Sequence, residues 1–540
     1  MFRPTSPQSS LFEVENSLPG ALPDNDWSFT YKERVLPLIV EDKFRHLYHE
    51  TKGKPNIPIK AAVSILIFMG MEKLTWRASE FLFSRRLDWL IATNTPIGGA
   101  RIDHTTLFKF YQRLEADDTA IKLFVEITDA FIKTCGTSVK MQRTDSFFIH
   151  GWLRILSRYG LFKETNRKFL QTLRKQKPNL YKKIKGQLSQ DYLEKKFDLT
   201  EKDRDLAQRK ISLMARDMYR IKSAFENHKK IQHYETFIIL CKVFEQQCEV
   251  KESIEQDFEI VLKEKPDKDT ICTPHNPEVR YVRKGNQRVT GDKGTVTETC
   301  DPDNKTQFIT DVSDNEATKH DSKEQPEVQE RLIENKFKPD KQFGDAGFVN
   351  GQTIMDSKEN KISLEGPTAG RSQSFETHES KERPFDAGDF DTTYTEQEKE
   401  LTVNKCPNNQ VPKDQHKSEK TGGFIVHFDS DTCDHCPEKN RCPVKIGKRV
   451  ATYTVDAIEF IGAVRHHQYM SDANYRKECA VRAGAEATVS ELTRGHGMRK
   501  SRHRKRSRTK LQLTFAALAC NVKRFIRHGE KYGYLEPSHA

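Results

Sequence analysis

A strand-like pattern stands between two long helical stretches of the chain, and it restricts the fold to the mixed α/β class. In Ser138–Phe148 every second residue falls on one face, in the series Val139, Met141, Arg143, Asp145 and Phe147. Successive side chains of a strand point to opposite faces, so this alternation is typical of a β-strand. The pattern also places a carboxylate, that of Asp145, at the end of the strand.

The region before this strand, from about residue 29 to residue 136, has the periodicity of helices. Trp76–Leu90 carries an apolar stripe with three arginines on its polar side, Arg77, Arg85 and Arg86. Thr93–Arg101 contains Pro and Gly and predicts a loop, and Asp103 is a good N-cap. Helices are therefore predicted over Ile57–Glu72, Trp76–Leu90 and Thr105–Leu114. This order of elements suits a DNA-binding module, and it equally suits any small helical bundle.

The region after the strand predicts helices, then strands, then helices again. Leu161–Lys263 is helical and polar, with twenty Lys and Arg against nine Asp and Glu between residues 163 and 230. It is either a solvated insert or a surface that tracks phosphates. Asn350–Asn404 is poor in aliphatic residues and predicts an irregular or partly disordered segment. The other expected elements are a hairpin of Thr295–Cys300 with Gln307–Val312, a strand in Lys341–Phe348, and helices over Pro326–Asn335, Ala473–Arg494 and Thr509–Arg527.

Basic charge is in excess over the whole chain and concentrated in one stretch near its end. The chain has 90 Lys and Arg against 78 Asp and Glu, which suits either a polyanionic partner or ordinary surface charge. Arg494–Lys510 holds nine Lys and Arg and no acidic residue. This stretch is either a solvated face or a surface for DNA phosphates. In the second case the contacting residues would be Arg499, Arg502, Arg504 and Arg506.

Several classes of protein find no support in the sequence. Met1–Asp26 is polar and has no apolar segment typical of a secretory signal. The longest apolar run, Ala61–Met71, is shorter than the roughly 20 residues needed to span a bilayer. We therefore expect a soluble, cytoplasmic protein with no membrane partner. The chain also lacks the GxxxxGK[ST], HExxH and GxSxG motifs.

A cluster of cysteines has the spacing of a zinc site. The chain contains eleven cysteines, and Cys433, Cys436 and Cys442 fall within ten residues. Thiolates at such spacing can converge on a tetrahedral Zn²⁺, and Cys406, in a turn-like sequence, is the natural fourth ligand. His435 is the alternative fourth ligand, and a set of free thiols in a loop is the alternative to a metal site. A site with four thiolates would be structural, because it leaves no open coordination position.

Three carboxylates are candidates for a catalytic metal site. Asp145 and Asp345 lie at the ends of two predicted strands, and Ala346-Gly347 allows close approach of a ligand after Asp345. Glu486 lies beside an apolar helical stripe formed by Val481, Ala485, Val489 and Leu492. Carboxylates from two strands and a helix can hold two hard cations, Mg²⁺ or Mn²⁺, about 4 Å apart. Asp311 and Asp314, near another strand end, are the alternatives.

The chain resembles bacterial insertion-sequence transposases with a DDE, RNase H-like catalytic domain. The resembling segments are KMQRTDSFFIHG (140–151), TETCDPDNKTQFITD (297–311), FGDAGF (343–348), RAGAEATVSELTRGHGMRKSRHRKRSRTKLQLTFAALACNVKRF (482–525) and, before the catalytic region, PIKAAVSILIFMGMEKLTWRASEF (58–81). Arg482 and Glu486 reproduce an Arg-three-residues-Glu spacing of this family. Cys479 and Thr493 depart from it, since a Tyr and a Lys are common at these places.

The resemblance implies a transposase that cuts and rejoins double-stranded DNA at element ends and target, as a homodimer associated with the nucleoid. Asp145, Asp345 and Glu486 would be catalytic, and Arg482 would contact DNA. We expect an RNase H-like mixed-sheet core with a helical N-terminal domain and two inserts, one helical and one irregular and zinc-bearing. The expected boundaries are 1–136 (helical DNA-binding domain), 137–160 and 271–349 (core), 161–270 (basic helical insert), 350–460 (cysteine-bearing insert) and 461–540 (glutamate helix, basic stretch and closing helix). The alternatives are a non-enzymatic zinc-containing DNA-binding protein and an inactive transposase remnant.

Overall fold

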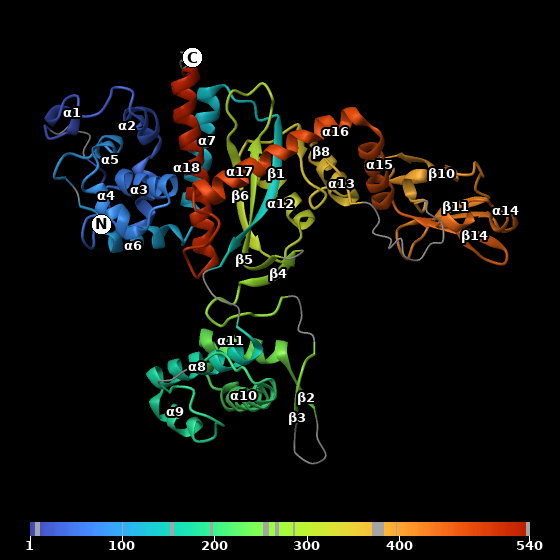
Figure 1. Cartoon of the computed structure of the whole chain (residues 1–540), viewed down its shortest axis with the longest axis horizontal. Helices are drawn as coiled ribbons and strands as arrows, with labels where there is room; N and C mark the ends of the chain where they lie inside the picture. The colour runs from blue at the N-terminus through green and yellow to red at the C-terminus, as the bar shows by residue number, and fades with distance from the viewer. Residues whose placement is uncertain are drawn as a thin grey trace.

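The computed structural model describes residues 1–5, 11–99, 101–151, 156–194, 198–251, 259–264, 269–284, 287–369, 383–395 and 397–535 (Figure 1). N-terminal helices lie beside a central sheet, a helical unit extends from one end of the sheet, and a β-rich unit extends to its side. The mixed α/β class predicted from the sequence is confirmed. In the described ranges no helix is both long and apolar enough to cross a membrane.

A six-stranded mixed sheet forms the centre of the molecule. Its strands are β1 (Met141–His150), β4 (Arg280–Lys284), β5 (Gln287–Thr299), β6 (Ile309–Glu316), β7 (Lys341–Phe343) and β8 (Ser363–Glu365). The order is β4-β5-β1-β7-β8, and β6 pairs with β5. Strand β1 is antiparallel to β5 and parallel to β7, and β7 is parallel to β8. The antiparallel pairing of β5 with β6 confirms the predicted hairpin.

Helices cover both faces of this sheet. Successive side chains of a strand point to opposite faces, so the sheet can pack against helices on both sides. Thr295 bonds to Glu324 of α12 (Asp321–Glu334), which packs on one face together with α13 (Gly351–Glu359). The neighbouring Val296 points to the other face, into a core shared with α18 (Arg506–Tyr532). Helix α12 begins five residues before the predicted start and contains Pro326.

The N-terminal region is helical, as predicted. Its elements are α1 (Val14–Ser17), α2 (Trp27–Thr30), η1 (Tyr31–Val35), η2 (Leu36–Leu38), η3 (Glu41–Leu47), α3 (Ile59–Glu72), α4 (Trp76–Phe83), α5 (Leu87–Ala92), α6 (His104–Leu114) and α7 (Thr119–Cys135). Asp103 caps α6 by accepting hydrogen bonds from the backbone N–H groups of Thr105 and Thr106. The single helix predicted over 76–90 is wrong, because the backbone of Arg86 leaves the helical region (φ −94°, ψ 120°). The Arg86 side chain pairs instead with Glu72 and Asp88.

Helix α18 joins the N-terminal helices to the sheet. Gly70 of α3 faces it so closely that a Cβ there would lie 2.9 Å from the Cβ of Ala519. Helix α18 also packs on α7 and β6, and Phe131 of α7 stacks on Phe525 with ring centroids 4.0 Å apart. One hydrophobic core therefore runs from α3 through α18 into the sheet.

A helical unit between β1 and β4 has a hydrophobic core of its own. Its elements are α8 (Arg158–Gln176), α9 (Pro178–Lys185), α10 (Arg204–Phe225), η4 (Ile231–His233), α11 (Glu235–Gln247), β2 (Cys248–Lys251) and β3 (Glu259–Leu262). The helices predicted over 161–263 are confirmed up to Gln247, where the chain turns into the β2–β3 hairpin.

The segment 350–404, predicted to be irregular, is largely ordered in its described parts. Strand β8 is the last strand of the central sheet, and helix α13 precedes it. The chain then enters a β-rich unit with a separate core. This unit comprises η6 (Ala387–Asp389), β9 (Asp391–Thr395), β10 (Glu400–Lys405), β11 (Asp414–Lys417), β12 (Phe424–Asp429), α14 (Ser430–Asp434), η7 (Lys439–Arg441), β13 (Lys445–Ile446) and β14 (Val450–Val455). Few aliphatic residues suffice here because the strands are short and bury only alternate side chains. The chain returns to the sheet through α15 (Ala457–Ser471), α16 (Ala473–Cys479), η8 (Ala480–Ala483), α17 (Gly484–Ser490) and η9 (Glu491–Gly495).

Candidate active site and cysteine cluster

Asp145 lies within β1, and Asp345 follows the neighbouring parallel strand β7 by two residues. The prediction that Asp145 ends its strand is wrong, because pairing with β5 continues β1 to His150. The pairing of β1 with β7 ends at Arg143 and Phe343, and each aspartate comes two residues after that pair. The Asp145 side chain accepts a hydrogen bond from the backbone N–H of Ser146 at 2.7 Å. Asp345 Oδ1 accepts from the N–H of Gly347 at 2.8 Å and from that of Phe348 at 3.3 Å. The local backbone thus fixes both carboxylates at one edge of the sheet.

A fourth carboxylate, Asp321, borders the same space and was missed by sequence reasoning. A Cβ at Gly347 would lie 2.9 Å from Asp321 Oδ2 and 3.0 Å from Asp345 Oδ1. Any side chain at residue 347 would therefore displace one of these carboxylates. Asp321 is the first residue of α12, and its Oδ1 lies 2.6 Å from Lys293 Nζ.

Lys293 is the signal that could have pointed to Asp321. It stands in the middle of β5, and its side chain is only 5% exposed. A buried ammonium needs an anionic partner, because burial of an unpaired charge costs several kcal/mol or more. A lysine in the middle of a strand of mostly small and β-branched residues therefore predicts a carboxylate close to that strand. The sequence does not identify which carboxylate it is.

A network of ion pairs fixes the Glu486 helix against β1. The guanidinium of Arg143 passes beneath Gly484, where a Cβ would lie 1.9 Å from Nη1, and it donates to the carbonyl of Val481 at 2.9 Å. Arg143 also pairs with the buried Glu298 at 2.7 Å. Only glycine at residue 484 leaves room for this arrangement, so the residue two places before Glu486 is fixed by packing.

The network continues from Glu298 into the closing helix. Arg524 of α18 lies 2.8 Å from Glu298 and 2.8 Å from Glu491. The hydroxyl of Thr488, two residues after Glu486, donates to Glu298 at 2.6 Å. These carboxylates hold the pKa of Arg524 above its usual value, and Arg524 helps to hold that of Glu491 below its own against the effect of burial. The charges are thus mutually neutralised and position α17 without taking part in the site.

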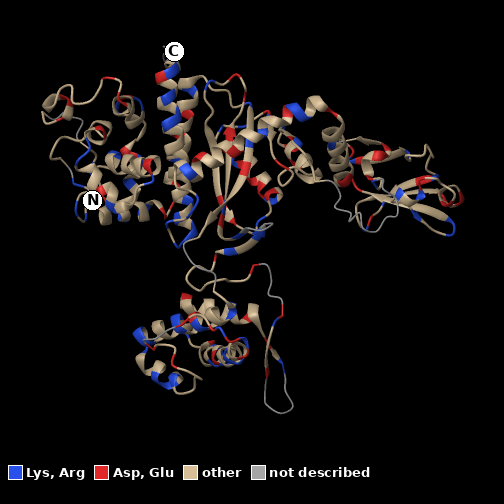
Figure 2. Ribbon diagram, in the orientation of Figure 1, with Lys and Arg blue, Asp and Glu red and all other residues tan. Residues whose placement is uncertain are grey.

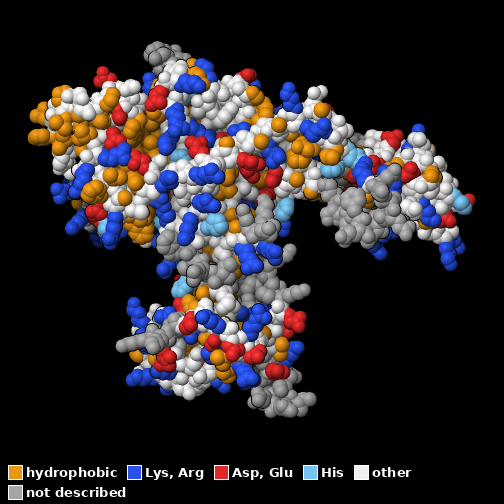
Figure 3. All heavy atoms as spheres, viewed as in Figure 1, with side chains coloured by type: hydrophobic (Ala, Val, Ile, Leu, Met, Phe, Trp, Pro, Cys, Tyr) orange, Lys and Arg blue, Asp and Glu red, His pale blue; other side chains and the backbone are white. Residues whose placement is uncertain are grey.

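Among the described ion pairs none neutralises Asp145, Asp345 or Glu486, whereas Asp321 is paired with Lys293. Burial raises the pKa of Asp145 to about 6, and repulsion from Asp345, Asp321 and Glu486 adds to the rise. Figure 3 shows Asp and Glu side chains gathered in the middle of one face of the molecule, with Lys and Arg beside them. The oxygens of Asp145, Asp345 and Glu486 are not among the described ligand sets that lie within 4.8 Å of one another. Glu486 is exposed on α17.

The two alternative carboxylates are engaged elsewhere. Asp311 is buried and receives two hydrogen bonds from Arg331 of α12, at 2.9 and 2.8 Å. The Asp314 side chain is 1% exposed, and its Oδ2 lies 3.5 Å from Nε of Arg506. Burial and the neighbouring Asp292 raise the pKa of Asp314 well above its usual value.

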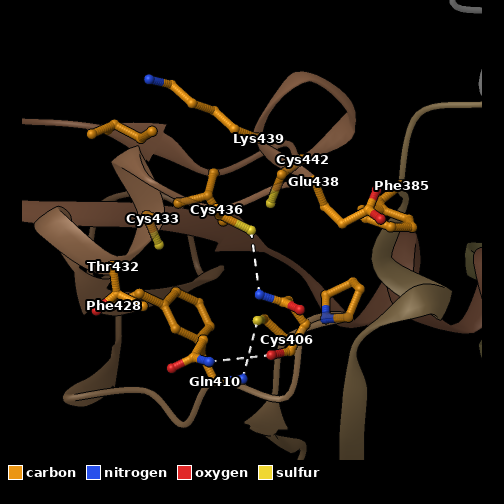
Figure 4. A pocket seen from close by; sticks show the side chains of 14 residues that line it. Phe385, Cys406, Gln410, Phe428, Thr432, Cys433, Cys436, Glu438, Lys439 and Cys442 are labelled. Carbon is orange, nitrogen blue, oxygen red and sulfur yellow. Dashed lines mark hydrogen bonds between the residues drawn. The ribbon is translucent and has the colours of Figure 1, made fainter. Parts of the chain in front are cut away.

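Four cysteines line one pocket of the β-rich unit (Figure 4). They are Cys406, Cys433, Cys436 and Cys442. Burial and the proximity of the other three raise the pKa of Cys433 to about 11. Backbone N–H of Gln410 donates to Cys406 Sγ at 3.3 Å, an interaction suited to a thiolate. His435 is 76% exposed and bonds to its own helix, so Cys406 rather than His435 joins the three clustered cysteines.

The arginines predicted to bind DNA fall into two groups. Arg499 and Arg504 are exposed, and Arg482 is half-buried on η8, four residues before Glu486. Arg502 instead donates to the backbone carbonyl of Leu74. Arg506 donates to the carbonyl of Asp314 at 2.9 Å. Lys and Arg also recur along the α18 ribbon in Figure 2.

Two family models match the chain. Residues 405–526 match a model described as a transposase DDE domain, and residues 25–113 match a transposase domain, DUF772. The predicted resemblance to insertion-sequence DDE transposases is confirmed. The first match spans the four cysteines, Glu486 and most of α18, and the second spans α2 to α6. No curated protein and no solved structure matches the chain.

Proposed function

We propose that this transposase cuts and rejoins DNA strands at a site formed by Asp145, Asp345 and Glu486. One observation carries the proposal. Asp145 of β1 and Asp345 after β7 each come two residues after the last pair of these parallel strands, and burial, with the nearby charges of Asp345, Asp321 and Glu486, raises the pKa of Asp145. Carboxylates without a Lys or Arg partner are stabilised by cations, and perturbed pKa values are common at catalytic sites.

The sheet supports an RNase H-like core for this site. An antiparallel β1–β5–β6 meander continues into two parallel strands, and helices cover both faces. We assign to this core residues 137–160 and 271–349, extended through β8 to residue 365, together with the closing segment 461–540. The helical unit within 161–270 and the β-rich unit up to 460 are its two inserts, and 1–136 is the N-terminal domain.

The chain's own residues suit Mg²⁺ or Mn²⁺. All four groups at the site are carboxylates, which are the ligands that hard cations prefer. When bound, two such ions would activate the attacking water or 3′-hydroxyl and stabilise the leaving oxygen. Asp145 and Asp345 would hold the cations from the sheet, and Glu486 would complete the set from α17. Asp321 would add negative charge at the same edge, while Lys293 holds it in place.

Double-stranded DNA would lie across this edge, bound mainly through its phosphates. Arg499 and Arg504 are exposed and suited to contact them, with Arg482 beside the glutamate helix. We propose that the ends of the element are recognised by the N-terminal helices, where exposed Arg77 and Arg85 border one groove. Two copies of the chain would bring two ends together.

Zinc at the cysteine cluster would be structural. Four thiols already line one pocket, and a tetrahedral ion needs no other ligand. The cluster is part of the β-rich unit, whose elements α14 and β14 lie apart from β1 and α17 in Figure 1. Its cation would therefore hold this unit together and take no part in strand cleavage.

The test is cation-dependent nicking of labelled DNA that carries the sequences flanking the gene. Asp145→Asn, Asp345→Asn and Glu486→Gln should each lower cleavage by orders of magnitude and leave DNA binding intact. Glu330→Gln, an exposed change on α12, is the matched control. Wild-type protein that binds DNA and never nicks it would favour an inactive remnant or a non-enzymatic DNA-binding protein.

A further inference from the structure

Two strands of the β-rich unit place two histidines and an aspartate on one exposed face. Asp414 of β11 stands directly opposite His427 of β12 in the antiparallel register. His416 lies two residues after Asp414, so its side chain points to the same face of the sheet. None of these residues belongs to the cysteine cluster or to the carboxylate site.

The three side chains have the spacing of metal ligands. Nδ1 of His427 lies 2.9 Å from Asp414 Oδ1, and Nδ1 of His416 lies 3.9 Å from the same oxygen. All three ligand atoms lie within 4.8 Å of one another. Zinc binds imidazole nitrogen and carboxylate oxygen at about 2.0–2.2 Å, so ligand atoms around one ion are somewhat over 3 Å apart. Small side-chain rotations would bring all three atoms to these distances without moving the strands.

The charge balance distinguishes this set from the other two described sets of potential ligands. In the set of Asp386, Asp389 and His467, both carboxylates pair with Arg383. In the set of Glu491, His496 and Cys520, the carboxylate pairs with Arg524. In the set of Asp414, His416 and His427, the described ion pairs of the carboxylate are only with the two histidines. Neutral histidines are good metal ligands, and no Lys or Arg competes with a metal for Asp414 among these described pairs.

Strand β11 also lacks another source of stability. It lies at the edge of the order β11-β12-β14-β13, and all four of its residues are exposed. It contributes no side chain to the hydrophobic core of the unit. Apart from the Asp414, His416 and His427 side chains, its described contacts are backbone pairing with β12, a bond from the backbone N–H of Val403 to the side chain of Gln415, and Lys417 Nζ 5.7 Å from the ring centroid of Phe424. A cation shared by β11 and β12 would hold this edge in register.

We propose that Asp414, His416 and His427 form a second transition-metal site, separate from the cysteine cluster. Two imidazoles and one carboxylate favour Zn²⁺ and related ions over Mg²⁺. Three protein ligands leave at least one coordination position to water, in contrast to the closed set of four cysteines. The site clamps the β11–β12 edge, and its occupancy does not depend on the catalytic proposal.

The test is a calorimetric titration of Zn²⁺, in excess Mg²⁺ that occupies the carboxylate site, into full-length protein whose cysteine cluster is already filled. The wild type should bind one further ion per chain. The double variant His416→Ala with His427→Ala should lose at least tenfold in affinity for this ion, and Asp414→Asn should weaken it while keeping the strand. His435→Ala, which removes an exposed histidine of the same unit, should bind like the wild type.

A second measurement separates a metal site from an ordinary ion pair between the strands. The added Zn²⁺ should slow amide hydrogen exchange in Asp414–Lys417 of the wild type and leave the double variant unchanged. Added Co²⁺ should bind there without a thiolate charge-transfer band, because no sulfur is a ligand. If the wild type binds no further ion, or the double variant binds it as tightly as the wild type, the site does not exist.

Discussion

Asp145→Asn should stabilise the metal-free protein while it abolishes catalysis. In the folded protein the pKa of Asp145 rises from its usual 3.8 to about 6, because burial and neighbouring carboxylates oppose its charge. Each pKa unit corresponds to 1.36 kcal/mol, so the ionised carboxylate costs about 3 kcal/mol of stability above pH 6. Asparagine removes this charge and keeps an oxygen for the hydrogen bond from Ser146.

The sign of the pH dependence follows from the direction of the shift. A carboxyl whose folded pKa is raised contributes stability below its unfolded pKa, and this stability is lost as pH rises through the folded value. The difference between Asp145→Asn and the wild type should therefore be about 3 kcal/mol at pH 8 and about half of that at pH 5. Below pH 4 it should approach zero.

Urea unfolding in EDTA, followed by tryptophan fluorescence, measures this difference. Trp89 is buried in the core shared by the N-terminal helices and the sheet, so its emission reports on the relevant unit. Excess Mg²⁺ should then stabilise the wild type, since it binds the folded state, and should have less effect on the variant. Equal or lower stability of Asp145→Asn at pH 8 would refute the electrostatic argument.

Three further predictions concern the cysteines, the basic stretch and the fourth carboxylate. Cys433→Ser should lower the zinc content by about one ion per chain and the melting temperature with it; unchanged zinc and stability would exclude the site. The double change Arg499→Gln with Arg504→Gln should weaken binding to all DNA sequences alike. It should also lower the slope of log binding constant against log salt concentration by about 2. An unchanged slope would show that the basic stretch is a solvated face and does not contact DNA phosphates. Asp321→Asn should leave Lys293 uncompensated and raise the Mg²⁺ concentration needed for half-maximal nicking; an unchanged requirement would remove Asp321 from the site.

Local patterns in the sequence predicted much of the core. The alternation over 138–148 gave β1, and the turn residues at 301–304 gave the β5–β6 hairpin, because both signals depend on a few neighbouring residues. The same local patterns pointed to Asp145, which lies within β1, and to Asp345, which follows β7. The spacing of Cys433, Cys436 and Cys442 predicted a zinc site; with Cys406 they line one pocket, but their sulfurs are not among the described ligand sets that lie within 4.8 Å of one another, so zinc binding stays a prediction.

The features that the sequence did not predict depend on contacts between distant parts of the chain. Asp321 and Lys293 are 28 residues apart, and no local pattern links them. The basic run predicts Arg506 as a phosphate ligand, but its partner in the structure is Asp314, 192 residues away. At the break between α4 and α5, Arg86 likewise pairs with Glu72 of another helix. Pairings of this kind join residues that are far apart in the sequence, so they can be identified only from the folded structure.

The central claim is that Asp145, Asp345 and Glu486 hold divalent cations as one unit, and Mn²⁺ binding tests it most directly. Electron paramagnetic resonance of full-length, zinc-saturated protein measures free and bound Mn²⁺ during a titration. Each single change, Asp145→Asn, Asp345→Asn or Glu486→Gln, should weaken Mn²⁺ binding strongly, while Glu330→Gln should bind like the wild type. Wild-type affinity in Glu486→Gln, with loss only in the two aspartate variants, would contradict the assignment of the glutamate to the site.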